Sequence, residues 1–178
     1  NVNLSKILRK LDRDDIIVEH YAGNDSNVNR SDSQPGYTSV LAVRVNDTDN
    51  RSYTVDVDNT SALFTYVYNG SSWKTENELK NKQGMNYSLA FNPGCDYAPG
   101  ARSWNMTVAG TGCHKNISSL NFVVNVYGTS NATYSSPTGL APYERGSSVI
   151  LRGTLYDECG NAVSDAAVDY TLVSGTSI

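Results

Sequence analysis

The stretch Trp104-Asn105-Met106-Thr107-Val108 decides the fold class of this chain. Apolar and polar residues alternate in it with a period of two, which predicts a β-strand. The tryptophan, the methionine and the valine then share a buried face, and Asn105 points to solvent. The same alternation recurs over 86–91 and 120–126, while residues that favour helices are few. The chain is therefore predicted to be all-β.

Short strands separated by turn signals extend from this stretch toward the N-terminus. Residues 41–45 and 53–57 alternate on either side of a polar turn at 46–50, which is typical of a hairpin. Residues 63–68 form a further candidate strand that is closed by the turn dipeptide Asn69-Gly70. About seven strands with frequent turns and no helical crossover predict an antiparallel β-sandwich.

Composition divides the chain into four predicted segments. Residues 1–37 form a leader with a short helical stripe, a first strand near 16–21 and a polar loop, and residues 38–128 form the sandwich. Residues 129–142 are rich in Ser, Thr and Gly and are predicted to be a linker. A new β unit begins at 143, with an Asp157-to-Asn161 turn between two alternating strands, and runs to Ile178.

The density of N-glycosylation acceptors is the strongest functional signal. The pattern Asn-x-Ser/Thr, with x other than Pro, occurs at 11 of the 19 asparagines, whereas random placement of Ser and Thr would give roughly 4 matches. The acceptors sit in turns or on the predicted solvent face of strands, so none needs to be buried. They are Asn3, Asn24, Asn29, Asn46, Asn50, Asn59, Asn69, Asn86, Asn105, Asn116 and Asn131.

Charge and hydropathy exclude two classes of partner. The net charge is −4 and the isoelectric point is about 5.1, which argues against nucleic-acid binding. No run approaches the ~20 apolar residues of a membrane helix, and no signal peptide is evident. We therefore expect a chain without a membrane span, from which any targeting segment has been removed.

The three cysteines fit an oxidising, extracellular compartment when they are considered together with the acceptors. Cys95 and Cys113 are the expected pair, and a bridge closing a loop of about 17–19 residues would contribute roughly 3 kcal/mol. Cys159 is then left over as a free thiol or as the partner of a cysteine outside the chain. Three pairings are open, and sequence alone does not choose among them.

Candidate catalytic groups are few. His20 and His114 are the only histidines, neither lies in a recognisable motif, and His20 is expected at the surface. A carboxylate pair for glycoside hydrolysis would have to come from acidic residues that nothing in the sequence brings together. These are Glu19, Glu76, Glu78, Glu144 and Glu158. The chain is therefore predicted not to be an enzyme.

Two metal sites and one sugar site are alternatives to this interpretation. Asp47, Asp49, Asp56 and Asp58 offer oxygen ligands for Ca²⁺, but no complete binding loop accompanies them, and a solvated acidic hairpin is the favoured explanation. A zinc site at Cys95, Cys113, His114 and Cys159 lacks the usual ligand spacing. Trp73 and Trp104 could stack on sugars, although Trp104 is expected in the core and Trp73 beside a turn. No cofactor is predicted.

Residues 143–174 resemble the opening half of prokaryotic immunoglobulin-like repeats. The resemblance rests on a strand at 145–156, the sequence Asp157-Glu158-Cys159-Gly160-Asn161, and a second strand that includes Ala167-Val168-Asp169-Tyr170. Residues 38–128 have the general look of an immunoglobulin-like domain. The acceptor density with few cysteines is similar to that of archaeal surface glycoproteins. The resemblance implies tandem immunoglobulin-like domains of an adhesin, a surface-layer (S-layer) protein or a filament subunit.

These observations predict a non-enzymatic, heavily glycosylated extracellular protein with a structural or adhesive role in a cell-surface layer or filament. Expected partners are neighbouring repeats or other copies of the chain, which could donate a strand to complete the unit at 143–178. The alternative is a carbohydrate-binding or accessory module of an extracellular enzyme. A viral envelope ectodomain would also explain the acceptors, but it would be expected to contain more cysteines.

Overall fold

The computed structural model describes residues 15–31, 38–48, 63–76, 81–83, 86–109, 114–139 and 143–171. The chain divides between Gly128 and Thr129 into two compact units. Every regular element in the described ranges is a β-strand, so the prediction of an all-β chain is confirmed. The expected helical stripe at the N-terminus lies outside these ranges.

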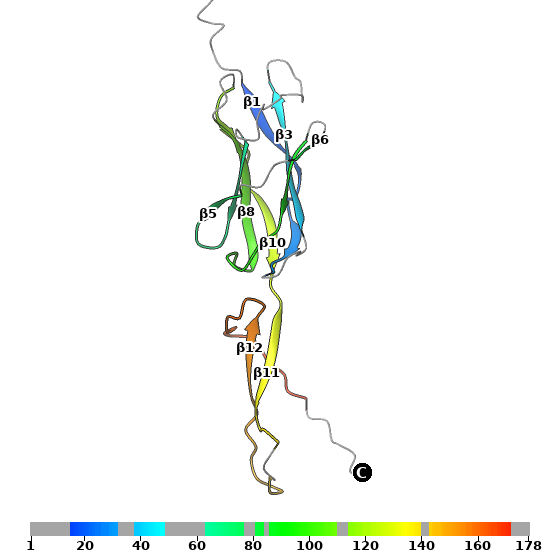
Figure 1. The fold of residues 1–178 in the computed structure, drawn as a ribbon, viewed down its shortest axis with the longest axis vertical. Helices are drawn as coiled ribbons and strands as arrows, with labels where there is room; N and C mark the ends of the chain where they lie inside the picture. Colours follow the sequence, from blue (N-terminus) through cyan, green and yellow to red (C-terminus); the bar gives the residue numbers. More distant parts are fainter. Residues whose placement is uncertain are drawn as a thin grey trace, which may run out of the picture. The chain divides into compact units, whose positions relative to one another are not determined.

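The first unit contains a sheet of four described strands, all paired antiparallel (Figure 1). Its spatial order is β1, β3, β7 and β6. The strands are β1 (Ile16–Ala22), β3 (Ser39–Asp47), β7 (Asn86–Phe91) and β6 (Asn81–Gln83). The predicted hairpin between 41–45 and 53–57 is not tested, since 53–57 lies outside the described residues. The pairs that the structure gives to β3 are instead with β1 and β7.

A second sheet faces the first. Its main order is β2, β10, β8, β4 and β5, with β9 also paired to β8. The strands are β2 (Ser26–Asn29), β10 (Phe122–Tyr127), β8 (Gly100–Val108), β4 (Leu63–Tyr68), β5 (Trp73–Glu76) and β9 (Ile117–Ser118). The β2–β10 pair is parallel and the others are antiparallel. The two sheets pack face to face in a sandwich-like arrangement.

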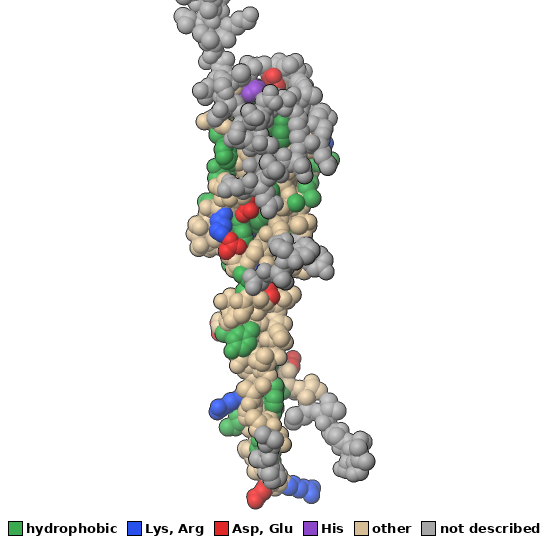
Figure 2. All heavy atoms as spheres, viewed as in Figure 1, with side chains coloured by type: hydrophobic (Ala, Val, Ile, Leu, Met, Phe, Trp, Pro, Cys, Tyr) green, Lys and Arg blue, Asp and Glu red, His purple; other side chains and the backbone are tan. Residues whose placement is uncertain are grey.

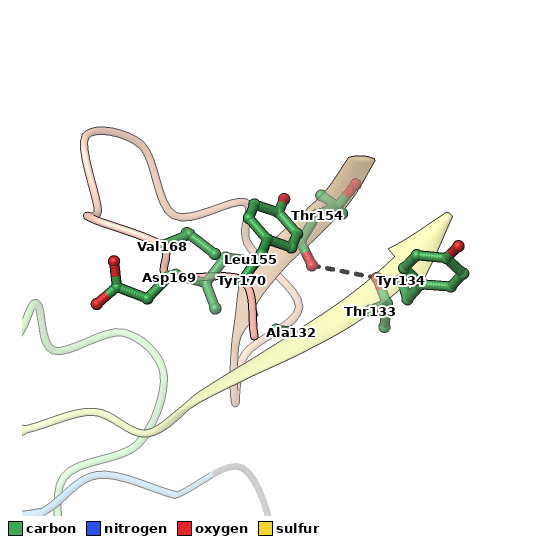
Figure 3. A pocket seen from close by; sticks show the side chains of 9 residues that line it. Ala132, Thr133, Tyr134, Thr154, Leu155, Val168, Asp169 and Tyr170 are labelled. Carbon is green, nitrogen blue, oxygen red and sulfur yellow. Dashed lines mark hydrogen bonds between the residues drawn. The ribbon is translucent and has the colours of Figure 1, made fainter. Parts of the chain in front are cut away.

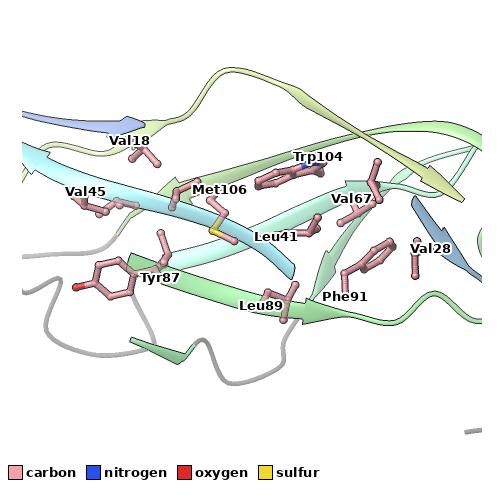
Figure 4. Close-up of a cluster of buried hydrophobic side chains, with 14 of the residues drawn as sticks. Val18, Val28, Leu41, Val45, Val67, Tyr87, Leu89, Phe91, Trp104 and Met106 are labelled. Atoms are coloured by element: carbon pink, nitrogen blue, oxygen red, sulfur yellow. The ribbon is translucent and has the colours of Figure 1, made fainter. Parts of the chain in front are cut away.

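The core lies between the two sheets, where alternate residues of each strand meet (Figure 4). Trp104, Met106 and Val108 of β8 are fully buried, as the sequence predicted, and they pack with Leu41 and Val43 of β3. Burial of each large apolar side chain contributes about 1.5–3 kcal/mol, so this alternation supplies the main stabilisation of the unit. The indole N–H of Trp104 also donates to the carbonyl of Gly23 at 3.3 Å.

The predicted leader differs from the observed structure after residue 15. Instead of one strand and a loop, 16–29 forms β1 in one sheet and β2 in the other. Polar residues around 24–29 look like a loop in sequence because β2 is short and only Val28 of it is buried. The position of β2 therefore depends on its backbone pairing with β10, because its side chains contribute little apolar burial.

The described part of the second unit contains a two-stranded sheet, β11 (Ser130–Ser136) paired antiparallel with β12 (Arg152–Asp157). Strand β11 falls in the predicted linker, so that part of the segment prediction is wrong. Apart from half-buried Ser136 its residues are exposed, and it therefore lacks the apolar alternation that signals a strand. The expected strand around 168–172 is not formed over 166–171.

The turn predicted at 157–161 is confirmed. The Asp157 carboxylate accepts backbone N–H bonds from Cys159 at 3.0 Å and from Asn161 at 2.8 Å. Gly160 adopts a positive φ of 77°, and its N–H donates to the Asp157 carbonyl at 3.0 Å. The aspartate thus organises the loop that follows β12.

Candidate functional site

The candidate functional site is distributed, because it consists of the acceptor asparagines. Eight of them lie in described ranges, and none of these eight is buried. Four are exposed, namely Asn24, Asn29, Asn116 and Asn131. Four are half-buried, namely Asn46, Asn69, Asn86 and Asn105. The remaining acceptors, Asn3, Asn50 and Asn59, lie outside the described residues.

Strands position five of these acceptors. Asn29, Asn46, Asn86, Asn105 and Asn131 belong to β2, β3, β7, β8 and β11 respectively. Asn105 lies between buried Trp104 and Met106, so the predicted alternation of faces is confirmed in β8. Residues 87, 89 and 91 of β7 are likewise buried, and Asn86 stands on the opposite face.

A tight turn positions Asn69 between β4 and β5. Its side-chain oxygen accepts the backbone N–H groups of Ser71 and Ser72, each at 2.9 Å. Gly70 follows with a φ of +110°, and a Cβ there would approach the Ala98 Cβ to 2.8 Å. These two bonds use the amide oxygen of Asn69, so the amide nitrogen, to which an N-linked sugar is attached, lies outside them.

Hydrogen bonds also hold two of the half-buried strand acceptors. The Asn105 amide donates to the Asn121 side-chain oxygen at 2.9 Å, and Arg44 donates to the Asn86 side-chain oxygen at 2.7 Å. These bonds restrict the rotamers of both acceptors on the outer faces of the two sheets.

The cysteines differ from the predicted arrangement. Cys95 and Cys159 are both disulfide-bonded. Of the two alternatives for Cys159, the free thiol is therefore wrong. The Cys113 end of the predicted Cys95–Cys113 bridge lies outside the described residues, so that pairing stays a prediction.

Sequence reasoning did not identify a polar corner at Tyr97, between β7 and β8. The Tyr97 hydroxyl donates to the Glu76 carboxylate, and the Arg30 guanidinium donates to the Tyr97 carbonyl at 2.8 Å. Lys74 pairs with Asp96 beside them. Burial, the hydrogen bond to Glu76 and the nearby carboxylates raise the pKa of Tyr97 well above its usual value. These partners come from separate stretches of the chain, and no local motif links them.

Both candidate catalytic histidines lie within the described ranges. His20 is exposed, as predicted, and it packs against Phe122 with 4.8 Å between ring centroids. The N–H of Asn24 donates to its Nε2 at 3.1 Å. His114 is half-buried between β8 and β9.

The candidate carboxylates are dispersed in the described part of the chain. Glu19 and Glu76 belong to different sheets, Glu144 is exposed, and Glu158 accepts the N–H of Thr129 at 2.6 Å. Glu78 lies outside the described residues.

The candidate metal ligands are only partly covered. Asp47 ends β3, whereas Asp49, Asp56 and Asp58 lie outside the described residues, as does Cys113 of the zinc set. Within the described ranges, no group of three or more His, Cys, Asp or Glu residues could hold a metal ion.

Aromatic side chains are exposed in both units. Trp73 is 45% exposed and contacts Tyr68 edge-on, with 5.8 Å between ring centroids, whereas Trp104 is in the core as predicted. In the second unit a hollow of about 210 Å³ lies against the β11–β12 sheet, where Leu155, Val168 and Tyr170 gather (Figure 3). On the face seen in Figure 2, the charged side chains of the described residues are scattered and form no continuous patch.

None of the described residues belongs to a helix that is long and apolar enough to cross a membrane. No protein-family model matches the chain, and a comparison with curated proteins finds no match.

Proposed function

We propose that the chain is a non-enzymatic, N-glycosylated extracellular protein with a structural or adhesive role in a cell-surface layer or filament. The observation that carries the proposal is the density of the acceptors together with their placement, since none of the eight described ones is buried while the residues between them build a core.

We further propose that the first unit is immunoglobulin-like. The order β1, β3, β7, β6 corresponds to strands A, B, E and D of that fold, and β10, β8, β4 correspond to G, F and C. Tyr97 falls at the corner between E and F, where such domains carry a tyrosine. The chain departs from antibody domains because its core tryptophan is on β8 and not on the strand that corresponds to C.

Two of the glycans would lie at the edges of sheets. Among the described strands, β2 is an edge of its sheet and carries Asn29, and the isolated pair β11–β12 carries Asn131. Edge strands present unpaired backbone groups to which other chains can add. Bulky, hydrated glycans at these positions would restrict such pairing and shield the backbone from proteases.

The second unit suggests how copies could assemble. A two-stranded sheet is marginally stable by itself, and a strand from a neighbouring repeat or from another copy would complete it. Electron micrographs and size-exclusion profiles of protein extracted from the source cell surface test this. Filaments or sheets support the assembly role, whereas discrete monomers contradict it.

A carbohydrate-binding module is the second candidate, and exposed Trp73 is the observation that favours it. Aromatic rings beside polar groups are suited to sugar faces. Binding to polysaccharides that is abolished by Trp73→Ala would support this candidate. The matched control is Tyr143→Ala, which removes an exposed aromatic ring of the second unit and should leave such binding intact.

A further inference from the structure

Three of the five strand-borne acceptors have a tyrosine directly opposite them on the neighbouring strand. The register pairs Asn105 with Tyr66, Asn29 with Tyr127, and Asn131 with Tyr156. Tyrosine makes up only 12 of 178 residues, so the six cross-strand partners of these acceptors would include fewer than one tyrosine at random. Asn46 lies opposite Ile17, and Asn86 lies between Arg44 of β3 and Gln83 of β6.

Asn105 and Tyr66 lie on the same outer face. Tyr66 stands between buried Thr65 and Val67, just as Asn105 stands between two buried residues of β8. Residues directly opposite on antiparallel strands have Cβ atoms about 4.5–5.5 Å apart. Phe64 extends the aromatic surface along β4, with 6.5 Å between its ring centroid and that of Tyr66.

The other two pairs are also open to solvent. Val28 and Val126 oppose each other in the core, so the next pair, Asn29 and Tyr127, faces outward. Tyr127 is 50% exposed and Tyr156 is 39% exposed. Both side chains are therefore partly open to solvent and lie opposite an acceptor.

A pyranose fits such a ring chemically. One face of the sugar consists largely of C–H groups, and the face of an aromatic ring carries partial negative charge that attracts them. The first sugar is bonded directly to the Asn side-chain nitrogen, so it is the sugar that can reach the cross-strand neighbour.

We propose that Tyr66, Tyr127 and Tyr156 are platforms on which the first sugar of the glycans at Asn105, Asn29 and Asn131 packs. The inference rests on the proposed function, because the acceptors must carry glycans. It adds that these three sugars are ordered parts of the folded surface, while those at Asn46 and Asn86 have no aromatic partner across the strand.

The test is a double-mutant cycle on the full chain, produced in a glycosylating host in which peptide mass spectrometry shows that Asn105 is occupied. Thermal unfolding is compared for Tyr66→Ala in the glycosylated chain and in the Asn105→Gln background. We expect Tyr66→Ala to lower Tm by about 3 °C more when the Asn105 glycan is present. The matched control uses Asn86→Gln, in which the effect of Tyr66→Ala should not change.

A second readout is independent of stability. Sugar protons stacked on a ring are shifted upfield in NMR spectra, and this shift should vanish in Tyr127→Ala, a variant at the half-exposed last residue of β10 that should keep the fold. Occupied acceptors with additive mutations and unshifted sugar protons would overturn the inference and leave the proposed function standing. Empty acceptors in protein from the native source would overturn both.

Discussion

At Gly23 the chain passes from one sheet of the first unit to the other, and the backbone geometry there requires glycine. Its φ is +96°, and a Cβ would lie 2.6 Å from the Val40 carbonyl oxygen, which belongs to backbone that cannot rotate away. We expect Gly23→Ala to lower the free energy of unfolding by about 3 kcal/mol in denaturant titrations.

The control for this variant is Gly100→Ala. Gly100 also has a positive φ, +112°, but the nearest atom to a Cβ there is the end of the flexible Arg102 side chain at 3.4 Å. That substitution should cost only about 1 kcal/mol for the backbone conformation. Equal losses for the two variants would show that steric contact at Gly23 does not matter.

The Tyr97 corner predicts a specific pH dependence. Its folded-state pKa is raised above the ordinary value of about 10, so the neutral phenol is favoured in the folded protein. The contribution of Tyr97 to the free energy of unfolding is fully present below pH ~10, and it is lost as the pH rises above that value. Tyr97→Phe should therefore flatten the alkaline fall of stability between pH 9 and 11, measured by urea unfolding. An unchanged alkaline slope would contradict the assignment.

Among the elements, those with regular apolar alternation could be predicted from the sequence. In β7 and β8 both the strand and its buried face are confirmed, because each residue that turns inward meets the opposite sheet. Strands β2 and β11 could not be predicted, since one is short and the other has no buried face. These two strands form because their backbones pair with segments that are distant in the sequence, and such pairing cannot be predicted from the residues of the strand itself.

The assignment of buried and exposed side chains in β3 can be tested with two adjacent residues. Leu41 is fully buried and Val40 is 52% exposed. Leu41→Ala should lower the free energy of unfolding by about 3 kcal/mol, whereas Val40→Ala should change it by less than about 1 kcal/mol. Equilibrium unfolding followed by tryptophan fluorescence measures both. Similar costs would mean that the strand does not present its side chains as described.

The bonding state of the cysteines gives a further prediction. Cys95 and Cys159 are both disulfide-bonded. We therefore expect a non-reducing peptide map to recover the peptides of both cysteines as cross-linked species. Either peptide recovered as a free thiol would contradict this bonding state.

For the whole molecule, the acceptor positions could be predicted from the sequence, but their surroundings could not. The motif needs only three consecutive residues, so Asn29, Asn105 and Asn131 are found by reading along the chain. Their tyrosine partners are far away in sequence, and the register between strands alone brings them together. The same limit applies to the Tyr97 corner.

We propose that the chain is a surface glycoprotein whose fold keeps its described acceptors out of the core. Peptide-level mass spectrometry of protein from its native source tests it most directly, by measuring glycan occupancy at each acceptor. We expect occupancy at most of the eight described positions, including the half-buried Asn105. Acceptors that are empty throughout would contradict the account and would favour an accessory module of an extracellular enzyme.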